Sequence, residues 1–397
     1  MKCICGIRRS LFFLEFKRCV LYLSNLIFEA LNYASLSTRN MLGQFYDVSG
    51  FSPVEIGFIT ACLPLIAMIS NPFWFRMTSR LNERVSFIII SLSSSFLFWM
   101  LFLSKSFILS IISISLFSFF YSSCIPIGDS LMMSSVKKHG GSFDKIRLFG
   151  TIGFSATSLI LSQLVKDGFI WYFIVASVTL FFSTMIIFFK KDTPKRFKSR
   201  KENPIIRNGN LFTFILMTVG FFFGVFMGSF HNTFIPILTR EMGLDNSAIG
   251  IILALMSITE VPFLFFADKI IKKFGNIKIF ILGLIATSVK TIIVTFAFNL
   301  VSILLMETLH GFTYILMYYS LFNYIHFKLP EKHLVRAQSA FWATSMGLSY
   351  IFSSVIGGFL VEWLQVKQSF RMVGSTGLLI TLIVFLISFK FRKLTDL

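Results

Sequence analysis

The chain alternates long apolar stretches with short polar segments rich in lysine and arginine. A helix needs about 20 apolar residues to cross the hydrocarbon core of a bilayer, whereas a tilted strand needs about 10. The stretches have helix length and lack the in-out alternation of a spanning strand, which excludes a β-barrel. The pattern therefore predicts an all-α, polytopic membrane protein with twelve spanning helices, near residues 19–45, 54–75, 85–104, 107–136, 146–165, 169–189, 211–238, 247–268, 278–298, 302–327, 337–363 and 371–389.

The twelve predicted helices divide into two sets of six. The basic segment 190–210 contains two prolines and no apolar run, and it separates residues 1–189 from residues 211–397. The glycine pattern around Gly50 and Gly57 recurs half a chain length later around Gly243 and Gly250. Because this match falls at equivalent helices of the two halves, it is typical of a duplicated transporter. We expect two six-helix bundles joined by a cytoplasmic linker.

The composition places the chain in lipid. Hydrophobic residues make up 55% of it, charged residues only 14%, and its mean hydropathy is +0.79. A soluble domain carries about 25% charged residues. The net charge of +19 would suggest nucleic acid for a soluble protein, but most of the 37 lysines and arginines lie on one side of the predicted topology. By the positive-inside rule both termini are cytoplasmic. We expect a monomer in a bacterial cytoplasmic (inner) membrane, in contact with lipid and without a nucleic-acid partner.

Several ionisable residues lie inside the apolar spans. Asp129 sits within one span and Arg147 begins the next, with a cytoplasmic hairpin between them. A charge in hydrocarbon is costly, so we expect this acid to face the bundle interior and to pair with Arg147. Glu260 and Lys290, near the middle of two further spans, likewise imply an ion pair or a wet cavity. The cysteines show no spacing typical of a metal site, and no metal or cofactor is expected.

Other polar residues in the spans allow more than one interpretation. Glu307, His310, Tyr314 and Tyr318 would form one stripe on a regular helix. They predict either a proton-responsive wall or a satisfied polar seam between helices, and the density of ionisable groups favours the wall. In the first span, Glu29 has only Arg39 as an evident partner, and we expect it to line a cavity. His231 is expected near the outer end of its span, either solvated or bonded to another helix.

These motifs resemble the major facilitator superfamily, specifically its lactose permease and phenylpropionate permease branch. Asp129 and the segment from Lys145 to Phe154 match the buried acid and arginine of that branch, and Ser288-Val289-Lys290 and Thr308-Leu309-His310 match two further motifs. The resemblance implies the major facilitator fold. It also implies that Asp129 and Arg147 bind the solute, with Phe154 at the position of the stacking aromatic residue, which is a tryptophan in lactose permeases.

The chain departs from the lactose permease pattern at the proton carrier. Residue 313, where that family has a glutamate, is Thr313. We therefore take Glu260 and Glu307 as the proton-coupling candidates. The superfamily's loop signature is present after the eighth helix, where it implies a gating role for Asp268 and Lys269, and it is degenerate around Ser79.

The predicted function is secondary active transport of a small organic solute by alternating access. Proton-coupled symport of a sugar or of an aromatic or organic acid is expected, with Arg147 and Lys290 bonded to carboxylate or hydroxyl groups of the solute. A proton-antiport exporter of hydrophobic compounds and a non-transporting membrane sensor remain alternatives. An enzyme is not expected, because the sequence has no nucleophile set, ligand spacing or phosphate-binding loop. The predicted solute-binding residues are Asp129, Arg147, Phe154, Lys290, His310 and Tyr314.

Overall fold

The computed structural model describes the backbone of residues 2–190 and 209–391. Side chains are described from residue 20 onward, except those at 264, 268, 332, 335, 345 and 346. Most of the predicted linker 190–210 lies outside the described residues.

The described residues of the first half contain eight α-helices. The fourth predicted span is two helices, α5 and α6, because the helix is interrupted at Ser122 and Ser123. A capping box begins α3: Ser52 accepts a hydrogen bond from the Glu55 amide, and the Glu55 carboxylate accepts one from the Ser52 amide. The segments are α1 (Lys2–Asn40), α2 (Leu42–Val48), α3 (Pro53–Leu81), α4 (Glu83–Leu103), α5 (Phe107–Tyr121), α6 (Cys124–His139), α7 (Phe143–Leu164) and α8 (Ile170–Phe189).

The second half is also helical, with one marked irregularity. The tenth predicted span contains α12, a 3-10 turn η3 (Thr308–Phe312) and α13, and Thr313 between the last two has φ −90° and ψ −104°. The regular stripe predicted from Glu307 to Tyr318 is therefore wrong. The helices are α9 (Leu211–Glu241), α10 (Ser247–Phe274), α11 (Asn276–Ile293), α12 (Leu300–Glu307), α13 (Tyr314–Asn323), α14 (Glu331–Ala343), α15 (Ser349–Leu364) and α16 (Val366–Lys390).

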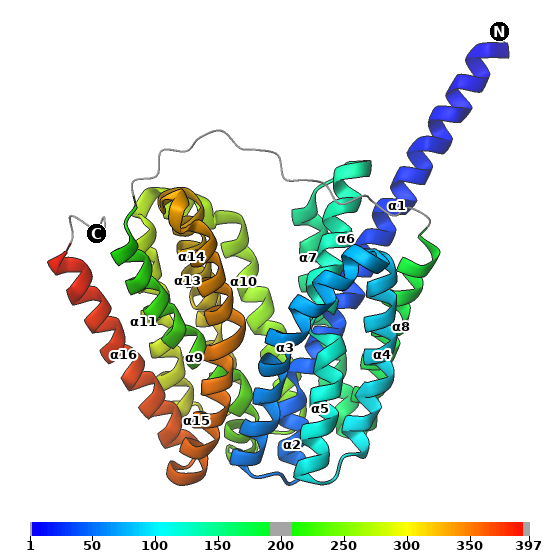
Figure 1. Cartoon of the computed structure of the whole chain (residues 1–397). Coiled ribbons are helices and arrows are strands. Elements are labelled where there is room, and N and C mark those ends of the chain that lie inside the picture. Colours follow the sequence, from blue (N-terminus) through cyan, green and yellow to red (C-terminus); the bar gives the residue numbers. More distant parts are fainter. Residues whose placement is uncertain (1, 191–208, 392–397) are drawn as a thin grey trace.

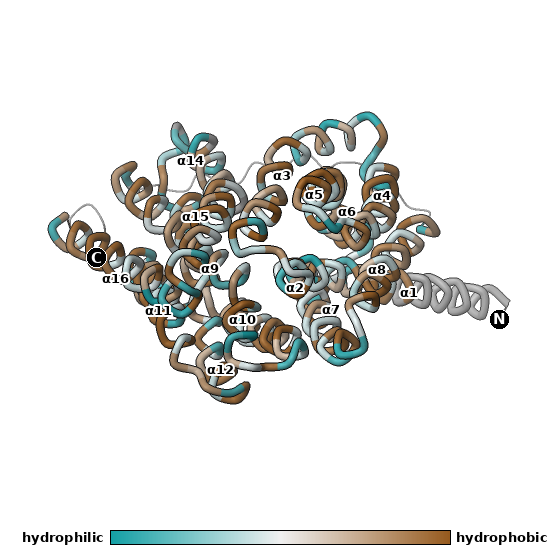
Figure 2. Tube along the Cα trace, turned by 90° about the horizontal axis from the view of Figure 1, so that it is seen from below, coloured by the Kyte–Doolittle hydropathy of each residue, from teal (hydrophilic) through white to brown (hydrophobic). Residues whose placement is uncertain are grey.

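The helices confirm the all-α membrane fold. Ten of the described helical segments are long and apolar enough to cross a bilayer, and each coincides with a predicted span. The other two predicted spans, 19–45 and 337–363, coincide with α1 and with α14 and α15. Figure 2 shows hydrophobic colour along most of the helices and hydrophilic colour mainly in the turns and at α2.

The two sets of helices meet at one end and separate toward the other. Figure 1 shows α1–α8 on one side and α9–α16 on the other, with the N-terminal end of α1 and the C-terminal end of α16 at the separated end. At the closed end α3 packs against α15 and α7 against α10. A Cβ atom on Gly57 would lie 2.3 Å from the Ser354 carbonyl oxygen, and one on Gly250 would lie 2.3 Å from the Ser158 carbonyl oxygen. Only glycine permits these two backbone approaches.

An ion pair joins the halves at the closed end. The Arg240 guanidinium on α9 donates two hydrogen bonds, of 2.9 and 3.0 Å, to the Asp47 carboxylate on α2. These two residues are 193 positions apart, the same separation as Gly50 and Gly243 in the sequence repeat. Asp47 and Arg240 are thus equivalent positions of the two halves that pair with each other. The Gln44 amide adds a 2.7 Å hydrogen bond to the Asn246 carbonyl oxygen beside them.

We expect Asp47→Asn to open the closed end more often, because it removes the charge that holds Arg240. A partly exposed ion pair contributes about 1 kcal/mol, which corresponds to a roughly fivefold change in a two-state population. Thiol labelling of a cysteine placed at Ser158 measures the opening. Asp167→Asn changes an exposed acid at the same end and should leave the labelling rate unaltered. Equal rates in both variants would refute this role of Asp47.

Candidate functional site

A first cluster of charged side chains lies where α1, α6 and α7 meet. The Arg147 Nη1 atom is 3.8 Å from Asp129 Oδ1 and 3.9 Å from Glu29 Oε1. The guanidinium stacks on the Tyr33 ring at 4.0 Å, and the Tyr33 hydroxyl donates to the Asp129 carboxylate at 3.4 Å. The structure therefore places Asp129 beside Arg147. It places Glu29 there as well, rather than beside Arg39.

Two glycines on α7 make this cluster possible. A Cβ atom on Gly150 would lie 2.8 Å from the Tyr33 ring, and one on Gly153 would lie 2.1 Å from the Ala30 carbonyl oxygen. Small residues allow two helix backbones to approach closely in a membrane. The close contact of α1 with α7 brings Glu29 within reach of Arg147.

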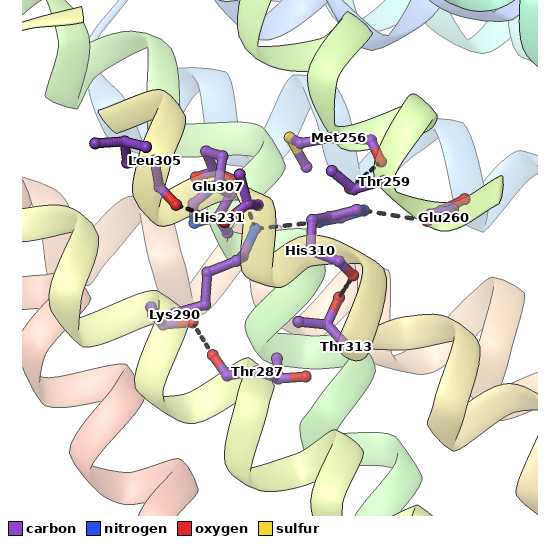
Figure 3. A network of polar contacts seen from close by, with 12 residues as sticks. His231, Met256, Thr259, Glu260, Thr287, Lys290, Leu305, Glu307, His310 and Thr313 are labelled. Carbon is purple, nitrogen blue, oxygen red and sulfur yellow. Dashed lines mark hydrogen bonds and ion pairs between the residues drawn. The ribbon is translucent and has the colours of Figure 1, made fainter. Parts of the chain in front are cut away.

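A second cluster forms a chain of polar contacts through the other half (Figure 3). The Lys290 ammonium on α11 donates to Glu307 Oε2 at 2.9 Å and contacts His310 Nδ1 at 3.2 Å. His231 Nε2 on α9 lies 2.8 Å from the other Glu307 oxygen. His310 Nε2 lies 3.1 Å from Glu260 Oε1 on α10. Five residues from five helical segments thus form one continuous chain.

The contact with Lys290 determines which ring nitrogen of His310 carries the proton. An ammonium group has donors only, so the His310 Nδ1 atom must accept the hydrogen bond. The proton of the neutral ring is then on Nε2, which donates to the Glu260 carboxylate. In this arrangement His310 is neutral and connects a cation with an acid.

The five side chains of this polar cluster range from fully buried to partly exposed. The side chains of Glu307 and His231 are 0% exposed and that of Lys290 is 2% exposed. His310 is 13% exposed and Glu260 is 29% exposed. A buried charge needs a partner of opposite sign, and Lys290 and Glu307 supply this to each other. Glu260 is therefore the most exposed of these five side chains.

The exposed cation of the first cluster and the exposed acid of the second lie on neighbouring helices, α7 and α10. The side chain of Arg147 is 42% exposed and that of Asp129 is 30% exposed. The helices that carry Arg147 and Glu260, α7 and α10, pack against each other across the two halves. Arg147, Asp129 and Glu260 are thus the charged groups that a solute between the halves would meet first.

The remaining predicted residues have varied positions. Phe154 is buried in α7, one helical turn from Gly150. Tyr314 packs against Tyr318 with ring centroids 5.4 Å apart. Lys269 is exposed, and its ammonium lies 5.9 Å from the centroid of the Phe266 ring. The Asp268 side chain lies outside the described residues.

The sequence interpretation missed His231 and Tyr33 as members of these clusters. His231 is fully buried, so the expectation that it might be solvated is wrong, whereas the alternative of a bond to another helix agrees with its contact to Glu307. The sequence did contain a signal for His231. Placing an imidazole in hydrocarbon is costly, as it is for the Glu260 carboxylate, so a polar partner was to be expected. The signal for Tyr33 was its spacing, since it lies four residues from Glu29 and hence on the same face of the first helix.

Comparison with known proteins identifies the family. The model of the MFS_1 like family, within the major facilitator superfamily, matches residues 28–372. The chain belongs to this family. It is therefore a membrane transporter of the major facilitator type and not an enzyme, and the resemblance seen in the sequence is confirmed.

Individual relatives are distant but cover most of the chain. The chain is 24% identical to the maltose permease of Geobacillus stearothermophilus over 79% of this chain and 81% of the relative. It is 20% identical to the lactose permease of Citrobacter freundii, covering 91% and 94% of the two proteins. Among solved structures, the nucleoside transporter NupG has a TM-score of 0.79 at 15% identity, covering 92% of this chain and 98% of that one. This structural likeness shows the fold.

We expect Glu307→Gln to destabilise this transporter strongly, because it leaves the Lys290 ammonium buried without its countercharge. Breaking a buried ion pair in this way costs about 3–5 kcal/mol. The double variant Lys290→Met with Glu307→Gln removes both charges and should recover part of the loss. Thermal unfolding in detergent measures the three proteins, and Lys269→Met is the control for an exposed lysine. A double variant less stable than Glu307→Gln alone would contradict the pairing.

Proposed function

We propose that this protein is a proton-coupled symporter of a small neutral polyhydroxylated solute, of the sugar or nucleoside class. The observation that carries the proposal is the unequal exposure of the two central cations. The side chain of Arg147 is 42% exposed beside Asp129, whereas that of Lys290 is 2% exposed in its pair with Glu307. A solute between the halves therefore meets one cation and two acids.

This set of charges favours hydroxyl groups over a carboxylate. A sugar or nucleoside hydroxyl both donates and accepts, so it can donate to Asp129 or Glu260 and accept from Arg147. An anionic solute would gain one cation but would meet two like charges. Two relatives are named for solutes of this class, a maltose permease and a putative nucleoside transporter of Escherichia coli K12, and a third is named a probable 3-phenylpropionic acid transporter. Lys290 and His310 then serve as members of the polar chain behind Glu260.

Glu260 is the proton carrier in this proposal. Glu307 has both Lys290 and His231 as partners within 3 Å, and these favour its ionised form. Glu260 has one neutral partner, His310, and is open to water. Lys290, Glu307 and Glu260 together carry one net negative charge, so a single proton on Glu260 makes the cluster neutral. That proton also ends the attraction between Glu260 and Arg147, and the guanidinium then bonds to the solute.

Transport follows from alternate opening of the two ends. The halves 1–189 and 211–397 rock about the central site, and the contacts at the closed end break as the contacts at the other end form. We place both termini on the inner side of a bacterial cytoplasmic membrane, because the basic segments gather on that side. The protein acts as a monomer in this proposal. Asp268 and Lys269 keep their proposed gating role at this cytoplasmic end.

Uptake in proteoliposomes tests the proposal. Labelled maltose, lactose and uridine are the probes, with 3-phenylpropionate as the anionic comparison. We expect one of the neutral probes to accumulate when an inward proton gradient is imposed. Arg147→Gln should reduce its uptake about 10–100-fold, the cost of losing a charged hydrogen bond of about 1.5–3 kcal/mol. Arg371→Gln, at an exposed site on α16, should leave uptake unchanged.

The variant Glu260→Gln separates coupling from binding. It should retain exchange of labelled for unlabelled solute but lose gradient-driven accumulation, because its side chain carries no exchangeable acidic proton. Uptake of 3-phenylpropionate alone would overturn the solute class. Gradient-driven extrusion of a hydrophobic dye would indicate the exporter, and binding of a probe without exchange would indicate a sensor.

A further inference from the structure

Glu29 is a buried acid that the proposed mechanism does not use. Its side chain is 0% exposed, and neither carboxylate oxygen has a hydrogen-bond partner among the described residues. The Arg147 Nη1 atom beside it is also buried without a hydrogen-bond partner in the same part of the chain. An orphaned carboxylate and an orphaned donor 3.9 Å apart are unusual, because buried polar groups are nearly always bonded.

The surroundings of Glu29 contain one base and a second acid. Asp129 faces it from α6 and Arg147 from α7, while Tyr33 on its own helix bonds to Asp129. Glu260 lies on α10, which packs against α7, the helix that carries Arg147. Two carboxylates and one guanidinium carry one net negative charge. In a membrane interior such an uncompensated charge is expensive.

One bound proton would neutralise the net negative charge of this cluster and would give the Glu29 carboxylate a hydrogen bond. The Glu29 and Asp129 carboxylates approach the same nitrogen, since Arg147 Nη1 lies 3.9 Å from Glu29 Oε1 and 3.8 Å from Asp129 Oδ1. Two ionised carboxylates have acceptors only, so they bond to each other only when one carries a proton. Adjacent carboxyl groups commonly share a single proton for this reason. The shared proton makes the three-residue cluster neutral and gives Glu29 its missing hydrogen bond.

Close packing holds the Glu29 side chain in this position. A Cβ atom on Gly150 would lie 3.3 Å from Glu29 Cγ, so α7 already packs tightly against the side chain. The Tyr33 ring lies on the same side, under the Arg147 guanidinium. The fold thus holds the acid beside Asp129 instead of letting it turn toward water.

We propose that Glu29 and Asp129 share one proton and form a second proton-binding site, in the first half of the chain and separate from the Glu260 chain. The role of this site in transport rests on the proposed function. With the proton present, Arg147 is balanced by one negative charge, and its exposed face is available to a solute. Without the proton, two carboxylates draw the guanidinium toward α1 and α6 and weaken solute binding.

Infrared spectroscopy of the purified protein tests the site without any solute. A protonated buried carboxyl has a carbonyl stretch that is distinct from carboxylate bands and shifts in D2O. At neutral pH we expect this band in the wild type, and we expect Glu29→Gln and Asp129→Asn each to remove it. Glu260→Gln should retain it, and Glu241→Gln, at an exposed acid, is the matched control.

The outcomes are separable from those of the transport assays. A band that is unchanged in Glu29→Gln, or that is absent from the wild type, overturns the shared proton even if uptake is proton-coupled. Both variants are checked by size-exclusion chromatography, so that a folded Asp129→Asn decides the question if Glu29→Gln does not fold. In proteoliposomes Glu29→Gln should lower the coupling ratio from two protons per solute molecule to one, and an unchanged ratio contradicts a role in coupling.

Discussion

The cost of placing a charge in hydrocarbon governs the centre of this protein. Ionisable side chains lie deep in the membrane-spanning helices, and each half gathers them into a cluster with one cation between two acids. Arg147 lies with Glu29 and Asp129, and Lys290 lies in a chain with Glu307 and Glu260. Each cluster is one proton short of neutrality. The same electrostatic requirement that holds the helices together therefore creates an affinity for protons at the place where a solute would bind.

The two clusters differ in the solvent exposure of their cations, and we infer from this difference which cluster binds the solute. The Lys290–Glu307 pair is withdrawn from the space between the halves, so its charges organise α9, α11 and α12 and are unavailable to a solute. Arg147 is 42% exposed, although stacking on Tyr33 covers one side of the guanidinium plane and the Nη1 atom is buried beside Glu29 and Asp129. A single accessible cation beside acids suits a ligand that is rich in hydroxyl groups.

The fold was largely readable from the sequence, because a spanning helix is defined by local apolar length alone. The Asp129–Arg147 proximity was also predictable, since the two residues flank one short hairpin. The path of the tenth span could not be predicted from the sequence. Its turn at Thr308–Phe312 follows from tertiary contact, because Gly311 lies so close to α10 that a Cβ atom would be 2.2 Å from the Thr259 carbonyl oxygen. The burial of His231 likewise depends on how α9 is rotated, which a pattern along one helix does not determine.

The relative strength of the contacts indicates where the molecule can move. Arg240 is 59% exposed in its pair with Asp47, so water replaces the lost interaction at a cost of about 1 kcal/mol or less. Separating Lys290 from Glu307 would leave buried charges at a cost of about 3–5 kcal/mol. The weak ion pair joins the two halves, whereas the strong one lies within a single half. Motion between the halves is therefore the inexpensive motion, and each charged cluster would travel intact while the access to it changes from one side of the membrane to the other.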